Sequence, residues 1–250
     1  MIPLFVFLVG LSVGSFINVP LFRFSEKEGV ATGRSKCISC KEQLNWYDLF
    51  PVLSYLILKT RCRNCNEKIS PLYPIIELAT AFSFLFFYLN NSSGSIILIL
   101  FYLALIAIFV ALTFFDLLYF TLPDKIILVS TMVVLAFYLI TKQVNFLNFI
   151  LSGLTLGCFF AIINLVSKGR WVGLGDAKLL FLIGLTLGYP LSFVVLIFSV
   201  WSAALLGIFL IIIGKATRKT ALPFGSFLSI ISILVIIFKN ELQKFTAQFF

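Results

Sequence analysis

Residues 171–190 read W-V-G-L-G-D-A-K-L-L-F-L-I-G-L-T-L-G-Y-P and place one aspartate, Asp176, at the head of an apolar run. This run stops at Gly188-Tyr189-Pro190, so as a helix it is only roughly 18 Å long at 1.5 Å per residue. A hydrocarbon layer of about 30 Å needs a longer helix. Irregular backbone at membrane depth is tolerated only where protein buries it or where it lines a wet cavity. The stretch therefore predicts a cavity-lining turn, with Asp176 at the dipole-positive start of a short helix.

The rest of the chain is equally apolar, because 61% of its 250 residues are hydrophobic and only 12% are charged. Soluble domains do not have this composition. We predict eight membrane segments, at residues 1–22, 72–89, 96–115, 126–140, 144–166, 177–187, 191–213 and 223–238. Strand-type alternation is not seen, so the predicted fold is an all-α polytopic membrane protein of about eight transmembrane helices rather than a barrel.

Basic residues are concentrated in alternate connections between these segments. Sixteen of the 19 Lys and Arg residues fall on one side, nine of them in residues 23–71. The cytoplasmic side of a membrane protein collects such residues. We therefore expect the loop 23–71 in the cytoplasm and both termini outside. The net charge of +9 is explained by these topology signals and by attraction to membrane lipid, and it requires no nucleic acid.

Four cysteines in the first loop form two pairs, Cys37-x2-Cys40 and Cys62-x2-Cys65. This arrangement is typical of two knuckles that supply four thiolates to one tetrahedral zinc. Two disulfides are the alternative, but they suit an oxidising compartment rather than the cytoplasm. We predict a structural zinc, since four protein ligands leave no open position for a substrate. The fifth cysteine, Cys158, has no basic neighbour and is expected to be a small buried apolar side chain.

Acids are the only catalytic candidates within the membrane segments, because the chain contains no histidine. Four of them, Glu77, Asp116, Asp124 and Asp176, lie inside or at the ends of apolar runs. A charge near the bilayer centre costs about 2.5–3.5 kcal/mol, so each of these carboxylates needs an explanation. Asp124 follows a Leu-Pro pair and is best explained as a helix cap. Glu77 fits an interfacial position and a functional one equally well.

Asp116 and Asp176 both lie at predicted cytoplasmic ends of membrane segments. Two carboxylates that share one proton differ in pKa, so that one can deprotonate water while the other polarises a carbonyl. The pair predicts peptide hydrolysis without histidine, although paired acids also serve proton-coupled transport. A coupled pair titrates as a unit, which leaves the identity of the base open. Lys178, two residues after Asp176, either extends to the membrane surface or tunes the pair.

These motifs together resemble the type IV prepilin peptidases, which are membrane aspartyl proteases with a G-x-G-D site. The resemblance covers nearly the whole chain and includes the four cysteines. The other matching segments are Gly14-Ser15-Phe16-Ile17-Asn18-Val19 followed by Arg23, Tyr73-Pro74-Ile75-Ile76-Glu77, Asp116 with Leu122-Pro123-Asp124, and the G-x-G-D-x-K-L-L segment with Gly173, Gly175, Asp176 and Lys178.

The resemblance implies an intramembrane aspartyl endopeptidase of the bacterial inner membrane, with Asp116 and Asp176 as the catalytic pair and no cofactor for this step. Its substrates would be prepilins or pseudopilins with a basic leader and a hydrophobic helix. Whether they build pili, a secretion pseudopilus or a DNA-uptake fibre is not encoded in this sequence, and neither is the oligomeric state.

Many members of this family also methylate the new N-terminus with S-adenosylmethionine. Asn18, Arg23 and Glu77 are the expected methyltransferase or structural residues. The chain departs from the family at Thr60, where glycine is usual, and at Pro20, so the resemblance leaves methylation open. The implied organisation is a first transmembrane helix at 1–22, a cytoplasmic zinc-binding loop domain at 23–71 that would carry any methyltransferase part, and a seven-helix bundle at 72–250 with the peptidase site.

Overall fold

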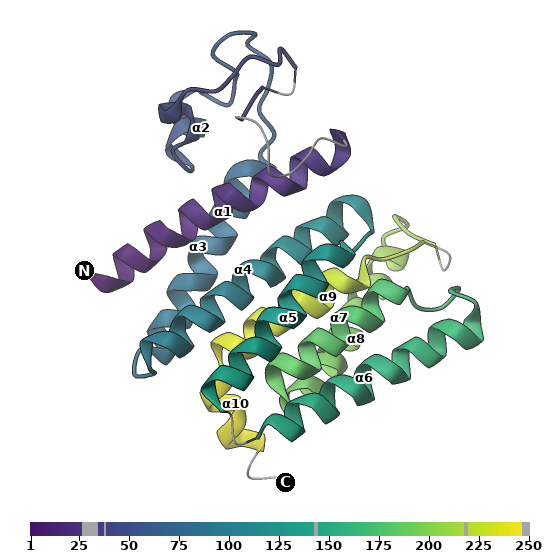
Figure 1. Ribbon diagram of the computed structural model, residues 1–250. Coiled ribbons are helices and arrows are strands. Elements are labelled where there is room, and N and C mark those ends of the chain that lie inside the picture. Colours follow the sequence, from purple (N-terminus) through teal and green to yellow (C-terminus); the bar gives the residue numbers. More distant parts are fainter. Residues whose placement is uncertain (27–34, 38, 143–144, 218–219, 247–250) are drawn as a thin grey trace. The chain divides into compact units, whose positions relative to one another are not determined.

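The structure, a computed structural model, describes residues 1–26, 35–37, 39–142, 145–217 and 220–246 (Figure 1). Each of the eight predicted segments contains an α-helix, which confirms the all-α class. The first residue of the fifth segment, Val144, and residues 27–34 and 38 of the first loop lie outside the described residues. The main helices are α1 (Ile2–Glu26), α3 (Leu72–Asn91), α4 (Ile96–Tyr119), α5 (Asp124–Thr141), α6 (Phe146–Ser167), α7 (Leu174–Leu187), α8 (Leu191–Ile212) and α9 (Phe224–Ile237).

Six of these helices, α1, α3, α4, α5, α6 and α8, are long and apolar enough to cross a membrane. Helices α7 and α9 have 14 residues each, which gives each about 21 Å of length. The short helix predicted at 177–187 is therefore present, although it begins at Leu174 and includes Asp176. A bend of 85° separates α9 from α10 (Lys239–Thr246), and this pair would be a seventh span if it crosses as one unit.

The first compact unit comprises residues 1–111. Its helices α1 and α3 lie side by side (Figure 1), because two glycines of α1 allow very close approach. A Cβ atom at Gly14 would lie 2.6 Å from the Cα of Glu77, and one at Gly10 equally close to Ala81. Small residues at such contacts are the usual basis of helix association in lipid. The 3₁₀ helix η1 (Trp46–Leu49) and the short helix α2 (Leu53–Ile57) lie in the loop between α1 and α3.

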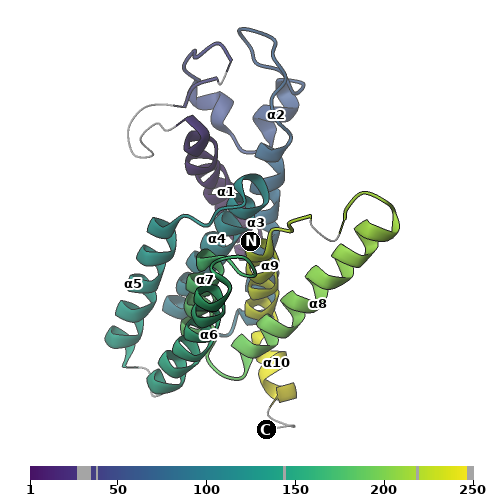
Figure 2. The same ribbon diagram turned by 90° about the vertical axis from the view of Figure 1, so that its right-hand side faces the viewer.

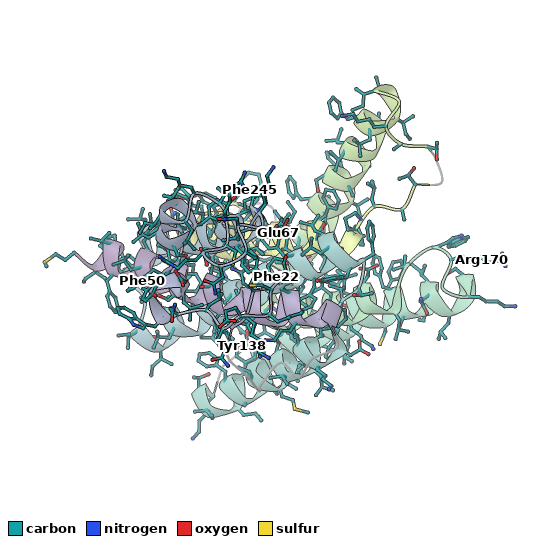
Figure 3. All side chains as sticks on the ribbon, turned by 90° about the horizontal axis from the view of Figure 1, so that it is seen from above. Phe22, Phe50, Glu67, Tyr138, Arg170 and Phe245 are labelled. Carbon is teal, nitrogen blue, oxygen red and sulfur yellow. The ribbon has the colours of Figure 1, made fainter. Side chains whose placement is uncertain are left out.

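The second compact unit comprises residues 112–250 and is organised around α7. Helix α6 lies along α7 (Figure 2), and a Cβ atom at Gly184 would lie only 2.5 Å from the Cα of Gly153. Tyr138 of α5, labelled in Figure 3, donates its hydroxyl to the carbonyl oxygen of Thr186 at 3.1 Å. These contacts hold the C-terminal half of α7 against α5 and α6.

Candidate active site and metal centre

Asp116 lies near the C-terminal end of α4 and is only 5% exposed. Its Oδ2 atom accepts a hydrogen bond of 2.7 Å from the backbone N–H of Ser226, in the first turn of α9. The helix N-terminus carries a partial positive charge, which favours a carboxylate at this place. The residue before Ser226 must be small, since a Cβ atom at Gly225 would lie 3.1 Å from the same Oδ2 atom. The first turn of α9 therefore holds Asp116.

Asp176 is the third residue of α7 and is half-buried. Gly173 is the N-cap, with an extended backbone, and it lies next to the Asp176 carboxylate. The expectation that G-L-G is irregular is therefore wrong for Leu174 and Gly175, which already belong to the helix. The physical reason is that the free amides of a first turn can be satisfied by a carboxylate at its third position.

The carboxylates of Asp116 and Asp176 are close enough for their charges to act on each other. Leu122, in the connection after α4, helps to set this arrangement. Its side chain would lie within 3.3 Å of a Cβ atom at Gly175 and within 2.9 Å of one at Gly225. The absence of side chains at both glycines thus lets one leucine pack against the first turns of α7 and α9. Three helix ends and one leucine bring the two acids together.

Lys178 does not contact the acid pair through a salt bridge in the described structure. Its Nζ atom lies 2.8 Å from Oδ2 of Asp124, the first residue of α5. The N-cap of α5 is Pro123 and no described side chain caps this end, so the expectation that Asp124 is the cap is wrong. Asp124 lies instead in the first helical turn, where the helix dipole still favours a carboxylate, and it pairs with α7. Both side chains are more than one third exposed, so solvent screens this ion pair.

Ser226 allows a sharp test of the first turn of α9. Ser226→Pro removes the amide that donates to Asp116, whereas Ser226→Ala removes only the hydroxyl. A hydrogen bond to a charged group contributes about 1.5–3 kcal/mol, so we expect the Pro variant to lose roughly 10- to 100-fold in kcat with an unchanged KM. The Ala variant should cleave at nearly the wild-type rate. Equal kcat values for two equally stable variants would show that this amide does not position Asp116.

The four predicted zinc ligands converge in the first unit. The sulfur atoms of Cys37, Cys40, Cys62 and Cys65 all lie within 4.8 Å of one another, and the Cys37 and Cys65 sulfurs are 3.9 Å apart. A tetrahedral zinc with Zn–S bonds of about 2.3 Å has sulfur-to-sulfur edges of about 3.8 Å. All five cysteines of the chain are unpaired thiols, so the disulfide alternative is not supported. The cluster fits zinc.

The two knuckles have the same backbone design. In each, the first cysteine donates its N–H to a glutamate carbonyl, Cys37 to Glu42 and Cys62 to Glu67, at 2.9 and 2.8 Å. The backbone N–H groups of Cys65 and Asn64 point to the Cys62 sulfur and lower the pKa of this thiol to about 7. A thiolate is the form that binds metal.

Cys158 is not one of the four clustered cysteines; it belongs to α6 and is exposed rather than buried. The expectation of a buried side chain is therefore wrong. The physical reason is that an apolar helix face in a membrane can contact lipid instead of protein.

The first unit also contains a cavity of about 250 Å³ beside the cysteine cluster. Two buried polar side chains reach it, Asn18 at 4% exposure and Glu77 at 6%. Asn18 donates from Nδ2 to the Tyr73 carbonyl at 3.3 Å and lies 3.5 Å from Oε1 of Glu77. Its Oδ1 atom is buried without a hydrogen-bond partner among the described residues. Buried polar atoms normally have a hydrogen-bond partner. This oxygen atom therefore indicates that the cavity accepts a ligand with a hydrogen-bond donor.

Glu77 accepts a second hydrogen bond, of 2.8 Å, from the backbone N–H of Val52. Val52 has φ 61 and ψ −45, which is an unusual conformation for a β-branched residue. Phe22, labelled in Figure 3, stacks on Tyr73 with ring centroids 4.0 Å apart, and Arg23 also lines the cavity. Asn18, Arg23 and Glu77, which the sequence singles out, all line this one cavity. The sequence does not predict the cavity itself.

The two departures from the expected motifs have little effect on the backbone. Thr60 adopts φ 66, the left-handed conformation for which glycine is preferred, and its carbonyl still accepts the N–H of Ile69 at 2.8 Å. Pro20 lies inside α1, and this helix continues to Glu26.

Gly225 and Ser226 were not identified from the sequence. The sequence signal that could have identified them is Pro223 followed by a glycine at the start of the last apolar run, because Pro favours the first turn of a helix. Val52 was also missed, since no sequence pattern predicts which loop amide reaches a buried carboxylate.

Two family models match the chain. The bacterial peptidase A24 N-terminal domain matches residues 8–91, and the type IV leader peptidase family matches residues 102–208. The prepilin leader peptidase/N-methyltransferase of Klebsiella pneumoniae is 33% identical over 195 residues, which are 74% of this chain and 85% of the relative. That of Bacillus subtilis is 28% identical over 96% of this chain and 95% of the relative. That of Myxococcus xanthus is 31% identical over 86% of this chain but only 65% of the relative. No solved structure matches.

Proposed function

Because the chain belongs to the type IV leader peptidase family, we propose that Asp116 and Asp176 cleave the leader from prepilin-like substrates at the cytoplasmic face of the inner membrane. The observation that carries this proposal is the convergence of the two carboxylates at helix ends. The alternative of a proton-coupled transporter that uses these acids is not supported, because both matching models describe peptidase domains.

The chemistry requires one ionised and one protonated carboxyl group. The ionised group takes a proton from water, and the water oxygen attacks the carbonyl carbon of the scissile peptide bond. The protonated group donates its proton to the carbonyl oxygen, which gives a tetrahedral intermediate. As the C–N bond breaks, the group that took the water proton passes it to the departing amine, and a hydroxyl of the intermediate returns a proton to the other carboxylate, so the pair again holds one proton. No metal or cofactor is needed for these steps. We assign one proton to the pair as a unit. We also propose that the active-site segment with Gly173, Gly175 and Lys178 contributes to this site from the N-terminal end of α7.

The substrate fits the membrane setting of this site. We propose that a basic leader lies at the cytoplasmic surface, while the hydrophobic helix that follows it lies in lipid beside the short helix α7. Sixteen of 19 basic residues lie on one predicted side, which supports external termini and a cytoplasmic zinc-binding domain at 23–71, with the peptidase bundle at 72–250. The cysteine cluster would hold one structural zinc that stabilises this domain.

Cleavage is tested with the purified, zinc-loaded protein in lipid nanodiscs. The substrate is a synthetic prepilin-like peptide with a basic leader and a hydrophobic helix, and the products are identified by mass spectrometry. We expect a single cut before the hydrophobic segment. A peptide in which the leader lysines are replaced by glutamine should be cut more slowly. Failure of the folded protein to cleave any prepilin-like peptide would overturn the proposal.

The relatives' names include an N-methyltransferase activity, and we propose that the cavity of the first unit carries it in this chain. When bound there, S-adenosylmethionine would supply the methyl group. Glu77 and Oδ1 of Asn18, which has no hydrogen-bond partner in the described part of the chain, are acceptors suited to a substrate ammonium or to the donor's own amine. Arg23 would face a carboxylate. This distribution of charge is the support for the assignment.

Glu77→Gln separates the two activities. With S-adenosylmethionine present, the wild type should give a mature product heavier by one methyl group. Glu77→Gln keeps a similar shape but loses the negative charge, so we expect cleavage at the wild-type rate and methylation reduced roughly 10- to 100-fold, as for a lost bond to a charged group. Normal methylation by this variant would exclude a role of Glu77 in methyl transfer. An unmethylated product from the wild type would exclude methyltransferase activity in this chain.

A further inference from the structure

The loop domain of the first unit has an exposed apolar surface that the cysteine cluster does not explain, and of its residues only Leu49 also lines the cavity. We call it the 46–57 patch, and it consists of Trp46, Leu49, Phe50, Leu53, Leu56 and Ile57 on η1 and α2 and between them. Trp46 is 70% exposed and Ile57 is 73% exposed. The rings of Trp46 and Phe50, the latter labelled in Figure 3, have centroids 5.9 Å apart. Contiguous apolar surface of this kind marks an interaction site.

The position of the patch within the unit is fixed by a hydrogen bond to a membrane helix. Val52, in the middle of the patch, donates its N–H to Oε2 of Glu77 at 2.8 Å. Glu77 is the sixth residue of α3, which places it about 7.5 Å along this helix. The segment before the patch emerges from α1, and both α1 and α3 qualify as membrane spans. The patch is thus held at the level where α3 enters the membrane.

The chemistry around the patch matches a lipid surface. Tryptophan is enriched where the hydrocarbon core meets water, because its ring is apolar and its N–H is polar. Three exposed basic residues, Lys59, Arg61 and Arg63, follow the patch. Arg63 forms a salt bridge with Asp48 at 2.9 Å. Lys59 and Arg61 follow the last residue of the patch by two and four positions in the sequence. Basic residues near an anionic leaflet are attracted to its negative surface potential.

We propose that the 46–57 patch inserts into the headgroup region of the leaflet that α1 and α3 enter, and that Lys59 and Arg61 bind the phosphates of anionic lipids. The domain is thereby fixed to the membrane at three places: the two helices that flank it and the patch between them. A basic peptide is a poorer occupant, because the two cations would repel it. The proposal does not depend on the catalytic roles of Asp116, Asp176 or Glu77.

The test uses the native tryptophan. The chain has three, so Trp171→Phe together with Trp201→Phe leaves Trp46 as the sole reporter in the full, zinc-loaded protein. The protein is placed in nanodiscs of phosphatidylcholine and phosphatidylglycerol, with or without bromine on the acyl carbons nearest the headgroups. We expect brominated lipid to quench about half or more of the Trp46 emission, because an interfacial indole would lie next to the bromines.

A matched control places the reporter elsewhere in the same domain. Asn64 is exposed on the second knuckle, and Asn64→Trp in a chain without the native tryptophans should be quenched little. Equal quenching of the two reporters, or none at Trp46, would overturn the proposal. Lys59→Gln with Arg61→Gln should make quenching of Trp46 weaker in anionic nanodiscs but unchanged in purely zwitterionic ones. If a prepilin-like peptide instead relieves the quenching in proportion to its binding, the patch is a peptide site and not a lipid anchor.

Discussion

Asp116→Asn and Asp176→Asn are each expected to abolish processing of a prepilin-like substrate. Asparagine has nearly the same shape as aspartate, but it can neither accept a proton from water nor donate one as an acid. Loss of general acid–base catalysis costs roughly 10²- to 10⁴-fold in rate, which would leave only the unprocessed band after co-expression with a prepilin. In Asp116→Asn the backbone amide of Ser226 can still donate to the carbonyl oxygen of the new side chain, so the fold around the site should survive.

The control for this pair is Glu241→Gln, which removes one negative charge from the exposed start of α10. It should process the prepilin at the wild-type rate. Circular dichroism and the thermal unfolding midpoint of the purified variants would show that the helices are intact. Wild-type processing by either asparagine variant, at equal expression, would contradict the assignment of the acid pair.

Cys62→Ser is expected to remove zinc from the protein and to unfold the loop domain. Cys62 is the buried member of the cluster, and its replacement leaves three thiolates. Structural zinc sites contribute about 10–16 kcal/mol of binding energy to folding, while a domain of this size has a small core of its own. The zinc content measured by metal analysis should fall from one ion per chain to nearly none. In limited proteolysis, the protease should cut within residues 35–70.

Cys158→Ser supplies the matched control, because this cysteine belongs to α6 and is not a member of the cluster. It should keep one zinc and resist proteolysis like the wild type. In Cys62→Ser the helices of the second unit should keep their thermal midpoint, since their contacts around α7 do not use the metal. Unchanged zinc content in Cys62→Ser would contradict the metal site.

Much of the helical architecture could be predicted from the sequence, because hydrophobicity over a membrane-spanning length is a local property. A short helix at 177–187 was predicted from the limited length of its apolar run, and in the structure it begins earlier, at Leu174. The cysteine spacing predicted the cluster that the structure brings together. Burial of Cys158 was predicted wrongly, since a helix in lipid has apolar residues on its outer face as well as its inner one. Composition does not distinguish those faces.

The candidate sites were predicted as residues but not as arrangements. The sequence identified Asp116 and Asp176 because carboxylates are costly in lipid. It did not indicate that Ser226, 110 residues from Asp116, would donate to it, or that Lys178 would pair with Asp124. Such contacts depend on which helix ends meet, and that is decided by packing between segments distant in the chain.

The sequence by itself determined the membrane character of this protein and the approximate positions of its helices, and it identified the candidate metal ligands and the candidate acid pair, because each depends on residue type and local spacing. Only the tertiary structure decided that Leu122 and two glycines bring three helix ends to one place, that Glu77 is bonded to the strained Val52, and that Asn18 keeps a buried acceptor in a cavity. The physical reason is that close approach of backbones, and the burial of polar atoms that follows from it, are properties of pairs of helices rather than of any one segment.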